Sequence, residues 1–296
     1  MAHVKNLFCS ENFSSPVSPA GRPECRTRVC VEAHSDRVLT SDERVLENLL
    51  LSEHSVKIRD YCHHTQTTIK PHMRKIVTDW MLEVCEDQHC QSEVFFLAVN
   101  YLDRFLSLVN IKKTQFQLVA SVCILLASKF SQVVPISSEQ LVIYTDNSVS
   151  FVELKEWELF VLSVLQWELS SATAHTFLQH FCNKVNCNHN VRRQAETIAA
   201  LACTEYKFIL NKQSVIAASA LAAALKEELN SSEELLSVLR TVASYMKTDL
   251  NEIFLCMYHI LNMDSPGQTE GKLGKVEDRP NTPDDVLNIS QNEIIV

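Results

Sequence analysis

The sequence predicts an all-α fold in which two five-helix domains follow one another along the chain. Three observations lead to this prediction: a scarcity of glycine, the helical spacing of apolar residues, and an internal repeat. The chain of 296 residues contains 4 glycines, none of them within residues 22–266, whereas average usage would give roughly 20. Because tight hairpins and phosphate-binding loops rely on glycine, this span argues against a β-rich fold, a Rossmann site, a P-loop and a kinase-type glycine-rich loop.

The first domain is expected within residues 41–168, as five helices preceded by a short one. Its opening helix begins at Pro71, a residue suited to the first turn, and continues with apolar residues at i, i+3, i+4 and i+7 spacing. Further helices are expected at about 92–108, at 114–130, after Pro135 with Ser137 or Ser138 as the cap, and at 151–165. The third is apolar nearly all round, which indicates a helix enclosed by the others.

A similar series recurs over residues 169–263. Helices are expected at about 173–185, 190–210, 213–228, 232–245 and 249–262, and the third again lacks a polar face. Residues 213–224 correspond to 117–126, about 96 positions earlier. This repeat predicts two stacked domains, each built around its own central helix. Residues 1–40 and 264–296, which lack this periodicity, are expected to form a disordered arm and an acidic, disordered tail.

Composition limits the partners that the chain can have. Its formal net charge of −9 disfavours binding to a phosphate backbone, which depends on Lys and Arg, so no nucleic-acid partner is expected. The longest apolar stretches are shorter than the about 20 residues of a membrane span, so no membrane association is expected either. Eleven cysteines, an odd count, fit reduced thiols in an intracellular compartment better than a disulfide framework.

One cluster of cysteines and histidines raises the question of a metal site. It consists of His180, Cys182, Cys187 and His189. A structural zinc site usually separates its two ligand pairs more widely, so we favour ordinary helix-end roles and leave metal binding open. No Cys–His, Ser–His or carboxylate arrangement indicates catalysis, and we expect neither an enzymatic activity nor a cofactor.

Four sequence blocks resemble the cyclin family. Residues 73–84 (MRKIVTDWMLEV) resemble the first helix of a cyclin box, residues 100–107 (NYLDRFLS) its second, and residues 125–130 (LLASKF) the end of its third. The fourth block, residues 143–148 (IYTDNS), resembles the D-type cyclins in particular. The resemblance covers about residues 40–262 and implies two tandem cyclin-box domains in a non-catalytic regulatory subunit of a serine/threonine protein kinase.

The resemblance implies cyclin-dependent kinase 4 or 6 as the partner. A protein kinase needs its strand lysine paired with a glutamate on helix C, and a cyclin that packs against that helix favours the paired state. By the same resemblance, Lys129 and Glu158 would hydrogen-bond to backbone groups of the kinase. Phe130, Leu154 and Trp157 would add apolar contacts on the same surface.

A docking groove for Arg-x-Leu segments of substrates and kinase inhibitors is also implied. Its side chains would be Met73, Ile76, Val77, Trp80 and Glu83 from the first helix of the box, with Phe116 and Gln117 from the third. Glu83 would meet a basic residue of the bound peptide. Arg74, in the same helix, is instead expected to hold the N-terminal segment in place.

Two short motifs lie in the arm and in the tail. Leu7, Cys9 and Glu11 project to one side of an extended strand and match the Leu-x-Cys-x-Glu motif that binds the retinoblastoma pocket. Thr282, followed by Pro283, resembles the C-terminal phosphorylation site of D-type cyclins, which promotes nuclear export and recognition by a ubiquitin ligase. The resemblance therefore implies both nuclear and cytoplasmic localisation.

Together these observations predict a subunit that activates a cyclin-dependent kinase and directs it to retinoblastoma-family substrates at the G1/S transition. An alternative is a cyclin-fold adaptor that binds transcription regulators without activating a kinase. It is left open because Ser131 and Gln132 stand where cyclins commonly have an acid. A nucleic-acid-binding protein of the same fold, similar to a general transcription factor, is disfavoured by the net charge.

Overall fold

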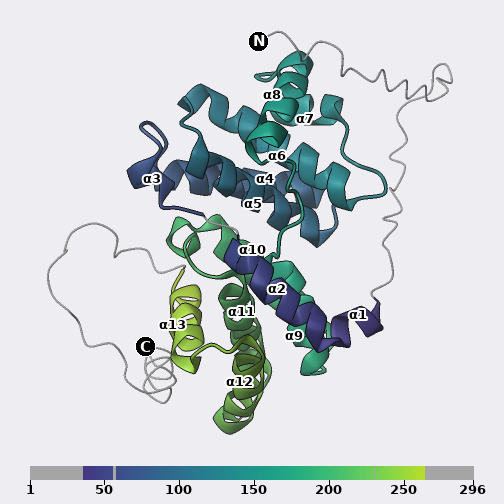
Figure 1. The fold of residues 1–296 in the computed structure, drawn as a ribbon, viewed down its shortest axis with the longest axis vertical. Helices are drawn as coiled ribbons and strands as arrows, with labels where there is room; N and C mark the ends of the chain where they lie inside the picture. The colour runs from purple at the N-terminus through teal and green to yellow at the C-terminus, as the bar shows by residue number, and fades with distance from the viewer. Residues whose placement is uncertain (1–35, 56–57, 230, 264–296) are drawn as a thin grey trace, which may run out of the picture.

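The computed structural model describes residues 36–55, 58–229 and 231–263, and the regular elements in these ranges are all helices. The first bundle contains α4 (Pro71–Asp87), α5 (Ser92–Leu108), α6 (Phe116–Ser131), α7 (Ser138–Tyr144) and α8 (Phe151–Val164). The second contains α9 (Ala174–Lys184), α10 (His189–Thr204), α11 (Gln213–Glu228), α12 (Ser232–Met246) and α13 (Leu250–Leu261). Figure 1 shows the two bundles stacked one above the other, so the predicted all-α fold with two five-helix domains is confirmed.

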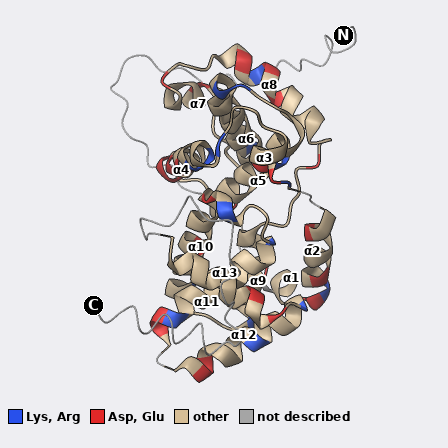
Figure 2. Cartoon of the chain, turned by 90° about the vertical axis from the view of Figure 1, so that its left-hand side faces the viewer, with Lys and Arg blue, Asp and Glu red and all other residues tan. Residues whose placement is uncertain are grey.

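The two central helices are also confirmed. In α6 every residue from 118 to 128 is buried, and in α11 every residue from 214 to 225. Both helices are free of charged residues over most of their length, as Figure 2 shows. The helical segment Lys113–Ser131 is the one in the described part of the chain that is long and apolar enough to cross a membrane, but 67% of its most apolar window is buried inside the bundle.

Local capping explains where the helices of the first bundle begin. The Ser137 side chain accepts from the backbone N–H of Gln140 at 3.2 Å and caps α7. Ser150 caps α8 in the same way, through the N–H of Glu153. Each cap is part of a capping box that satisfies two backbone donors at once.

The helix expected at residues 190–210 ends earlier than predicted. α10 stops at Thr204 because the next residue, Glu205, has an extended backbone with φ −82° and ψ 127°. A short 3₁₀ helix, η2 (Tyr206–Phe208), follows. A second one, η1 (Lys113–Gln115), leads into α6.

In the described part of the chain, three helices precede the first bundle, and the first two of them pack against the second bundle. They are α1 (Arg37–Ser41), α2 (Glu43–Ser55) and the single turn α3 (Tyr61–His64), which contacts α5 of the first bundle through Tyr61. α1 and α2 lie beside α9 in Figure 1 and contact it. The Glu53 carboxylate accepts from the backbone N–H and the hydroxyl of Ser214 at 2.7 and 2.8 Å. Helical structure thus begins at Arg37, before the expected boundary at residue 41, and this segment extends the second bundle.

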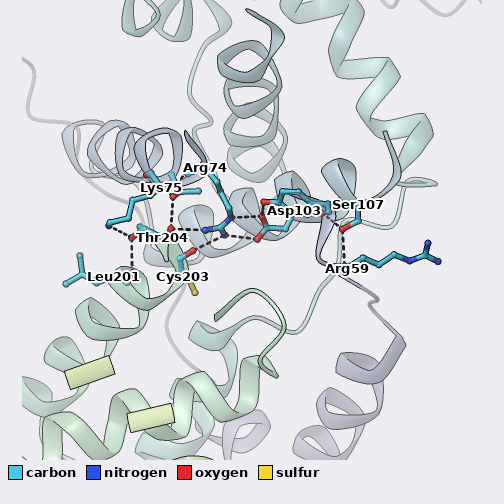
Figure 3. A network of polar contacts seen from close by, with 10 residues as sticks. Arg59, Arg74, Lys75, Asp103, Ser107, Leu201, Cys203 and Thr204 are labelled. Carbon is cyan, nitrogen blue, oxygen red and sulfur yellow. Dashed lines mark hydrogen bonds and ion pairs between the residues drawn. The ribbon is translucent and has the colours of Figure 1, made fainter. Parts of the chain in front are cut away.

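Arg74 joins the two bundles from a buried position in α4 (Figure 3). Its guanidinium donates to both carboxylate oxygens of Asp103 in α5, at 2.9 and 2.8 Å. It also donates to the backbone carbonyls of Thr204 at 2.8 Å and Cys203 at 3.0 Å, at the end of α10. The expectation that Arg74 holds the N-terminal segment needs correction, because its direct partners lie in the two bundles. That segment is attached through Tyr61, whose hydroxyl donates to Asp103 at 2.8 Å.

Glu93 and His175 form a second contact between the bundles, in the first turns of α5 and α9. The Glu93 carboxylate accepts from the hydroxyls of Thr173 at 3.0 Å and Thr176 at 3.4 Å, and it lies 3.9 Å from the His175 ring. Burial raises the pKa of Glu93 to about 7, against the opposing effect of the two hydroxyls. Burial lowers the pKa of His175 to about 4, and the charge of Arg192 adds to this effect.

Replacing Glu93 should therefore change how stability depends on pH. The folded pKa of Glu93 lies above the ordinary value of 4.5, so its contribution to stability is full below pH 4.5 and is lost as the pH rises through about 7. His175 acts in the opposite direction, with stability lost as the pH falls from 6.5 towards 4. In the unmodified chain, the ionisation of Glu93 therefore lowers the free energy of unfolding as the pH rises from 5 to 8. We expect Glu93→Gln to remove this decrease, which is on the order of 2 kcal/mol.

The measurement is urea unfolding of both proteins at pH 5 and pH 8. Glutamine can still accept from the two threonine hydroxyls, so the variant removes the ionisable group and keeps the hydrogen bonds. An identical pH dependence in the two proteins would contradict the assignment.

Candidate functional site

Lys129 and Glu158 come together on the surface of the first bundle, where α6 packs against α8. Lys129 lies in the last turn of α6, and Glu158 lies in the second half of α8. The Lys129 Nζ donates to Glu158 Oε1 at 2.7 Å. A second cation, Lys155, lies 3.4 Å from Glu158 Oε2, one turn earlier in α8.

This ion pair is partly exposed and can bind further groups. The side chain of Lys129 is 36% exposed and that of Glu158 is 12% exposed. The Lys129 ammonium has three donors and uses one of them on Glu158, so two remain for carbonyl oxygens of a partner. The second Glu158 oxygen keeps acceptor capacity for an N–H group. The arrangement fits recognition of polypeptide backbone.

Exposed apolar side chains extend this surface along the chain. Phe130, next to Lys129, is 50% exposed, and Val133 and Val134 follow it at 70% and 62%. Such residues are normally buried, so a cluster of them beside a charged pair is typical of a surface that binds another protein. The sequence analysis named Phe130 and missed the two valines.

The assignments within α8 are corrected in part. Leu154 is 0% exposed and belongs to the core, because it lies on the helix stripe that faces α6 together with Val161. Trp157 is half-buried and packs edge to face with Phe160, with their ring centroids 5.4 Å apart. Phe151, two turns before Glu158 on the same side of α8, is 44% exposed and can supply the exposed apolar contact that we expected from Leu154. Phe160 is 43% exposed but lies on another side of the helix, where it also packs against Phe105.

The residues expected to form the docking groove lie on α4 and α6, which contact one another. Met73, Val77 and Trp80 are half-buried, while Ile76 is 66% exposed. Glu83 lies on the exposed part of the same helix, seven residues and two turns beyond Ile76. The side chains of α4 thus present an apolar stripe that ends at a carboxylate.

The α6 side of this groove differs from the expectation. Phe116 is 4% exposed and packs in the core. α6 is enclosed by the other helices over most of its length, and Phe116 in its first turn is buried along with its centre. Gln117 is half-buried, and its side-chain carbonyl accepts from the Ser148 hydroxyl at 3.2 Å. Gln117 is therefore the one of these two residues that can contact a bound segment.

The histidine and cysteine cluster is divided between separate contacts. The His180 ring bonds with the backbone carbonyl of Thr40 at 3.1 Å. Cys182 and Cys187 interact with each other. No group of three or more His, Cys, Asp or Glu side chains with the arrangement of a metal site occurs among the described residues. Leu7, Cys9, Glu11 and Thr282 lie outside the described residues.

Comparison with known proteins agrees with this architecture. The profile of the family described as "Cyclin, N-terminal domain" matches residues 44–170, and that of "Cyclin, C-terminal domain" matches residues 172–286. Among solved structures, a viral cyclin from herpesvirus saimiri superimposes with a TM-score of 0.61 at 24% identity. The superposition covers 73% of this chain and 98% of the viral protein, and it shows that the fold is shared.

Curated relatives define the branch of the family. The chain is 39% identical to the G1/S-specific cyclin-D1 of Xenopus laevis over 274 residues, or 90% of this chain and 92% of the relative. It is 38% identical to the cyclin-D2 of Rattus norvegicus over 282 residues, or 90% and 98%. It is 44% identical to the cyclin-D3 of Homo sapiens over 205 residues, or 68% and 70%. These matches show that the chain belongs to the D-type cyclins of the cyclin family.

Proposed function

We propose that this chain is a regulatory subunit that binds and activates a cyclin-dependent kinase of the 4/6 type at the G1/S transition. The observation that carries the proposal is the partly exposed Lys129–Glu158 pair at 2.7 Å, followed along the chain by Phe130, Val133 and Val134. The names of the relatives, which are G1/S-specific cyclins, support the same stage of the cell cycle. The kinase contributes the catalytic groups, and this chain favours one conformation of the kinase by binding it more tightly.

Reconstitution tests this proposal. The full-length chain is mixed with each candidate kinase, recovered as a complex, and assayed for phosphorylation of a retinoblastoma fragment. Kinase 4 or 6 should co-purify and gain activity. If neither kinase gains activity although transcription regulators are retained, the function is that of the adaptor.

Substrate selection is proposed to rest on two elements. One is the stripe of Met73, Ile76, Val77 and Trp80 with Glu83 and Gln117, which would dock Arg-x-Leu segments of substrates and kinase inhibitors. The other is the Leu-x-Cys-x-Glu motif in the arm, which would bind retinoblastoma-family proteins. A basic Arg of a docked segment would pair with the exposed Glu83 carboxylate, and its Leu would contact the α4 stripe.

Replacing Leu7, Cys9 and Glu11 together with alanine should weaken retinoblastoma capture while leaving kinase activity towards a short peptide unchanged. The motif precedes the described helices, so the free energy of unfolding should change by less than about 0.5 kcal/mol. Capture of a retinoblastoma pocket fragment by the wild-type and variant complexes measures the effect. Undiminished capture would show that the groove suffices or that the motif is a coincidence.

Thr282 is proposed to control turnover and to shift the chain between nucleus and cytoplasm. Phosphorylation would add about 1.5–2 negative charges and strong acceptor oxygens, which an Arg-lined receptor of a ubiquitin ligase can bind. We expect Thr282→Ala to lengthen the half-life in cycling cells and to increase the nuclear fraction. Chase experiments after a block of protein synthesis measure the decay, and equal decay of the two proteins would overturn the assignment.

A further inference from the structure

Pairs of cysteines occupy the same position at the ends of two helices, α4 and α9. The two cysteines of each pair are five positions apart in the sequence: Cys85 with Cys90, and Cys182 with Cys187. In both, the chain turns through a residue with positive φ just before the second cysteine, at His89 with φ 49° and at Asn186 with φ 50°.

The backbone hydrogen bonds identify both turns as Schellman motifs. The N–H of Cys187 donates to the carbonyl of Cys182 at 3.1 Å, and the N–H of Cys90 donates to that of Cys85 at 2.9 Å. In this motif the two residues joined by the outer hydrogen bond also bring their side chains into contact. The corresponding positions at the end of α8 hold Leu162 and Trp167, an ordinary apolar pair.

This geometry brings each pair of thiols within range of a disulfide. With standard backbone dimensions, a 3.1 Å hydrogen bond between N–H 187 and carbonyl 182 keeps the two Cα atoms within roughly 7 Å. Disulfides span Cα separations of about 4.4–6.8 Å, so a small adjustment suffices. The side chains of Cys182 and Cys187 interact with each other, and neither cysteine is part of a disulfide.

The pair at α9 also has the charge environment of a reactive thiol. Cys187 is half-buried, whereas Cys182 is fully buried. The hydrogen bond from Cys182 lowers the pKa of Cys187 to about 7, and the Arg192 guanidinium of α10 adds to this effect against burial. Cys187 also lies directly before Asn188, the N-cap of α10, where the helix dipole favours a thiolate. At the α4 pair, the hydrogen bond with Cys90 and burial raise the pKa of the Cys85 thiol, and the nearby carboxylate of Glu86 adds a smaller effect in the same direction.

We propose that Cys187 and Cys182 form a peroxide-sensitive dithiol site, in which Cys187 is oxidised first and Cys182 resolves it to a disulfide. The Cys187 thiolate attacks one oxygen of hydrogen peroxide, the O–O bond breaks, and hydroxide leaves, which yields a sulfenic acid. The Cys182 sulfur then attacks the Cys187 sulfur and the S–O bond breaks. The departing oxygen leaves as water with the Cys182 proton. In total two thiols and one peroxide give one disulfide and two waters, and a thiol reductant reverses the change.

The experiment treats the purified full-length chain with hydrogen peroxide at pH 7, blocks the remaining thiols by alkylation, and maps disulfides by peptide mass spectrometry. The 182–187 bond should form first, several-fold faster than the 85–90 bond, which serves as a control with the same backbone geometry. In Cys182→Ala, dimedone should instead trap a sulfenic acid at Cys187. Arg192→Gln should slow the reaction by about ten-fold, and Arg192→Lys should restore most of the rate.

Three outcomes would overturn the proposal. These are an unmodified Cys187, a first disulfide at any other pair, and a sulfinic acid at Cys187 of the unmodified chain in place of the disulfide. The wild-type mapping decides between them even if the Cys182→Ala chain fails to fold.

Discussion

Replacing Lys129 with glutamate is expected to abolish kinase binding while the chain stays folded. The change places a second carboxylate beside Glu158, where the native ammonium lies 2.7 Å away. Under the proposed function, it also presents a negative charge to kinase carbonyls that should meet a donor. Losing one partner of a charged hydrogen bond at an interface costs about 2–5 kcal/mol. The dissociation constant for the kinase should therefore increase by a factor between about 30 and several thousand.

Lys155→Glu is the matched control for this prediction. Lys155 contacts the same Glu158 carboxylate at 3.4 Å, and its side chain is also 36% exposed. The control therefore makes the same change in net charge at an equally exposed site. Kinase capture by the control should stay within a few-fold of wild type, because exposed ion pairs contribute only about 0–1 kcal/mol. Equal losses in the two variants would indicate a general charge effect and would remove Lys129 from the contact.

A charge-swapped variant separates a role in binding from a role in folding. Lys129→Glu combined with Glu158→Lys restores an ion pair between α6 and α8 with its direction reversed. If the pair only holds the two helices together, the swap should recover kinase binding. If each group meets a specific backbone partner of the kinase, the swapped chain should fold normally, as judged by circular dichroism, and still fail to bind.

The fold could be predicted from the sequence because its strongest signals are local. α6 and α11 lack a polar face, and such helices are stable only when others enclose them. The start of α7 at Ser138 follows from the capping residue before it. The packing of α1 and α2 against α9 could not be predicted in this way, because it depends on contacts such as Glu53 with Ser214, which are 161 residues apart.

The candidate site was predicted less completely, and the errors have a common cause. Leu154 and Phe116 were placed on the surface by the resemblance to the cyclin family, yet the helix period turns both inward. The spacing of seven residues between Leu154 and Val161 carries this signal. Val133 and Val134 were missed because they follow the end of α6, where no periodicity indicates which side chains are exposed.

No local sequence pattern predicts the contact partners of Arg74. Removing these contacts is the second change for which we expect a large effect. Arg74→Met should destabilise the chain by about 3–5 kcal/mol, because it leaves the buried Asp103 carboxylate without its cation. Burial is the largest single effect and would lower the pKa of Arg74, but the charge of Asp103, the nearby Tyr61 and the hydrogen bonds to Asp103 together outweigh it. The pKa is raised and the guanidinium stays charged. Lys75→Met is the control, since Lys75 is 40% exposed and its ion pairs with Asp79 and Glu205 should contribute less than about 1 kcal/mol.

The same variant tests whether Arg74 couples the two bundles. All three tryptophans, Trp80, Trp157 and Trp167, lie in the first bundle or directly after it, so their fluorescence reports on that bundle. Circular dichroism reports on both bundles. In wild type the two probes should give one urea midpoint, as expected for a single cooperative transition. In Arg74→Met the hydrogen bonds to the carbonyls of α10 are lost, so the two midpoints should separate. A variant that loses stability while its midpoints still coincide would show that Arg74 stabilises the first bundle without coupling it to the second.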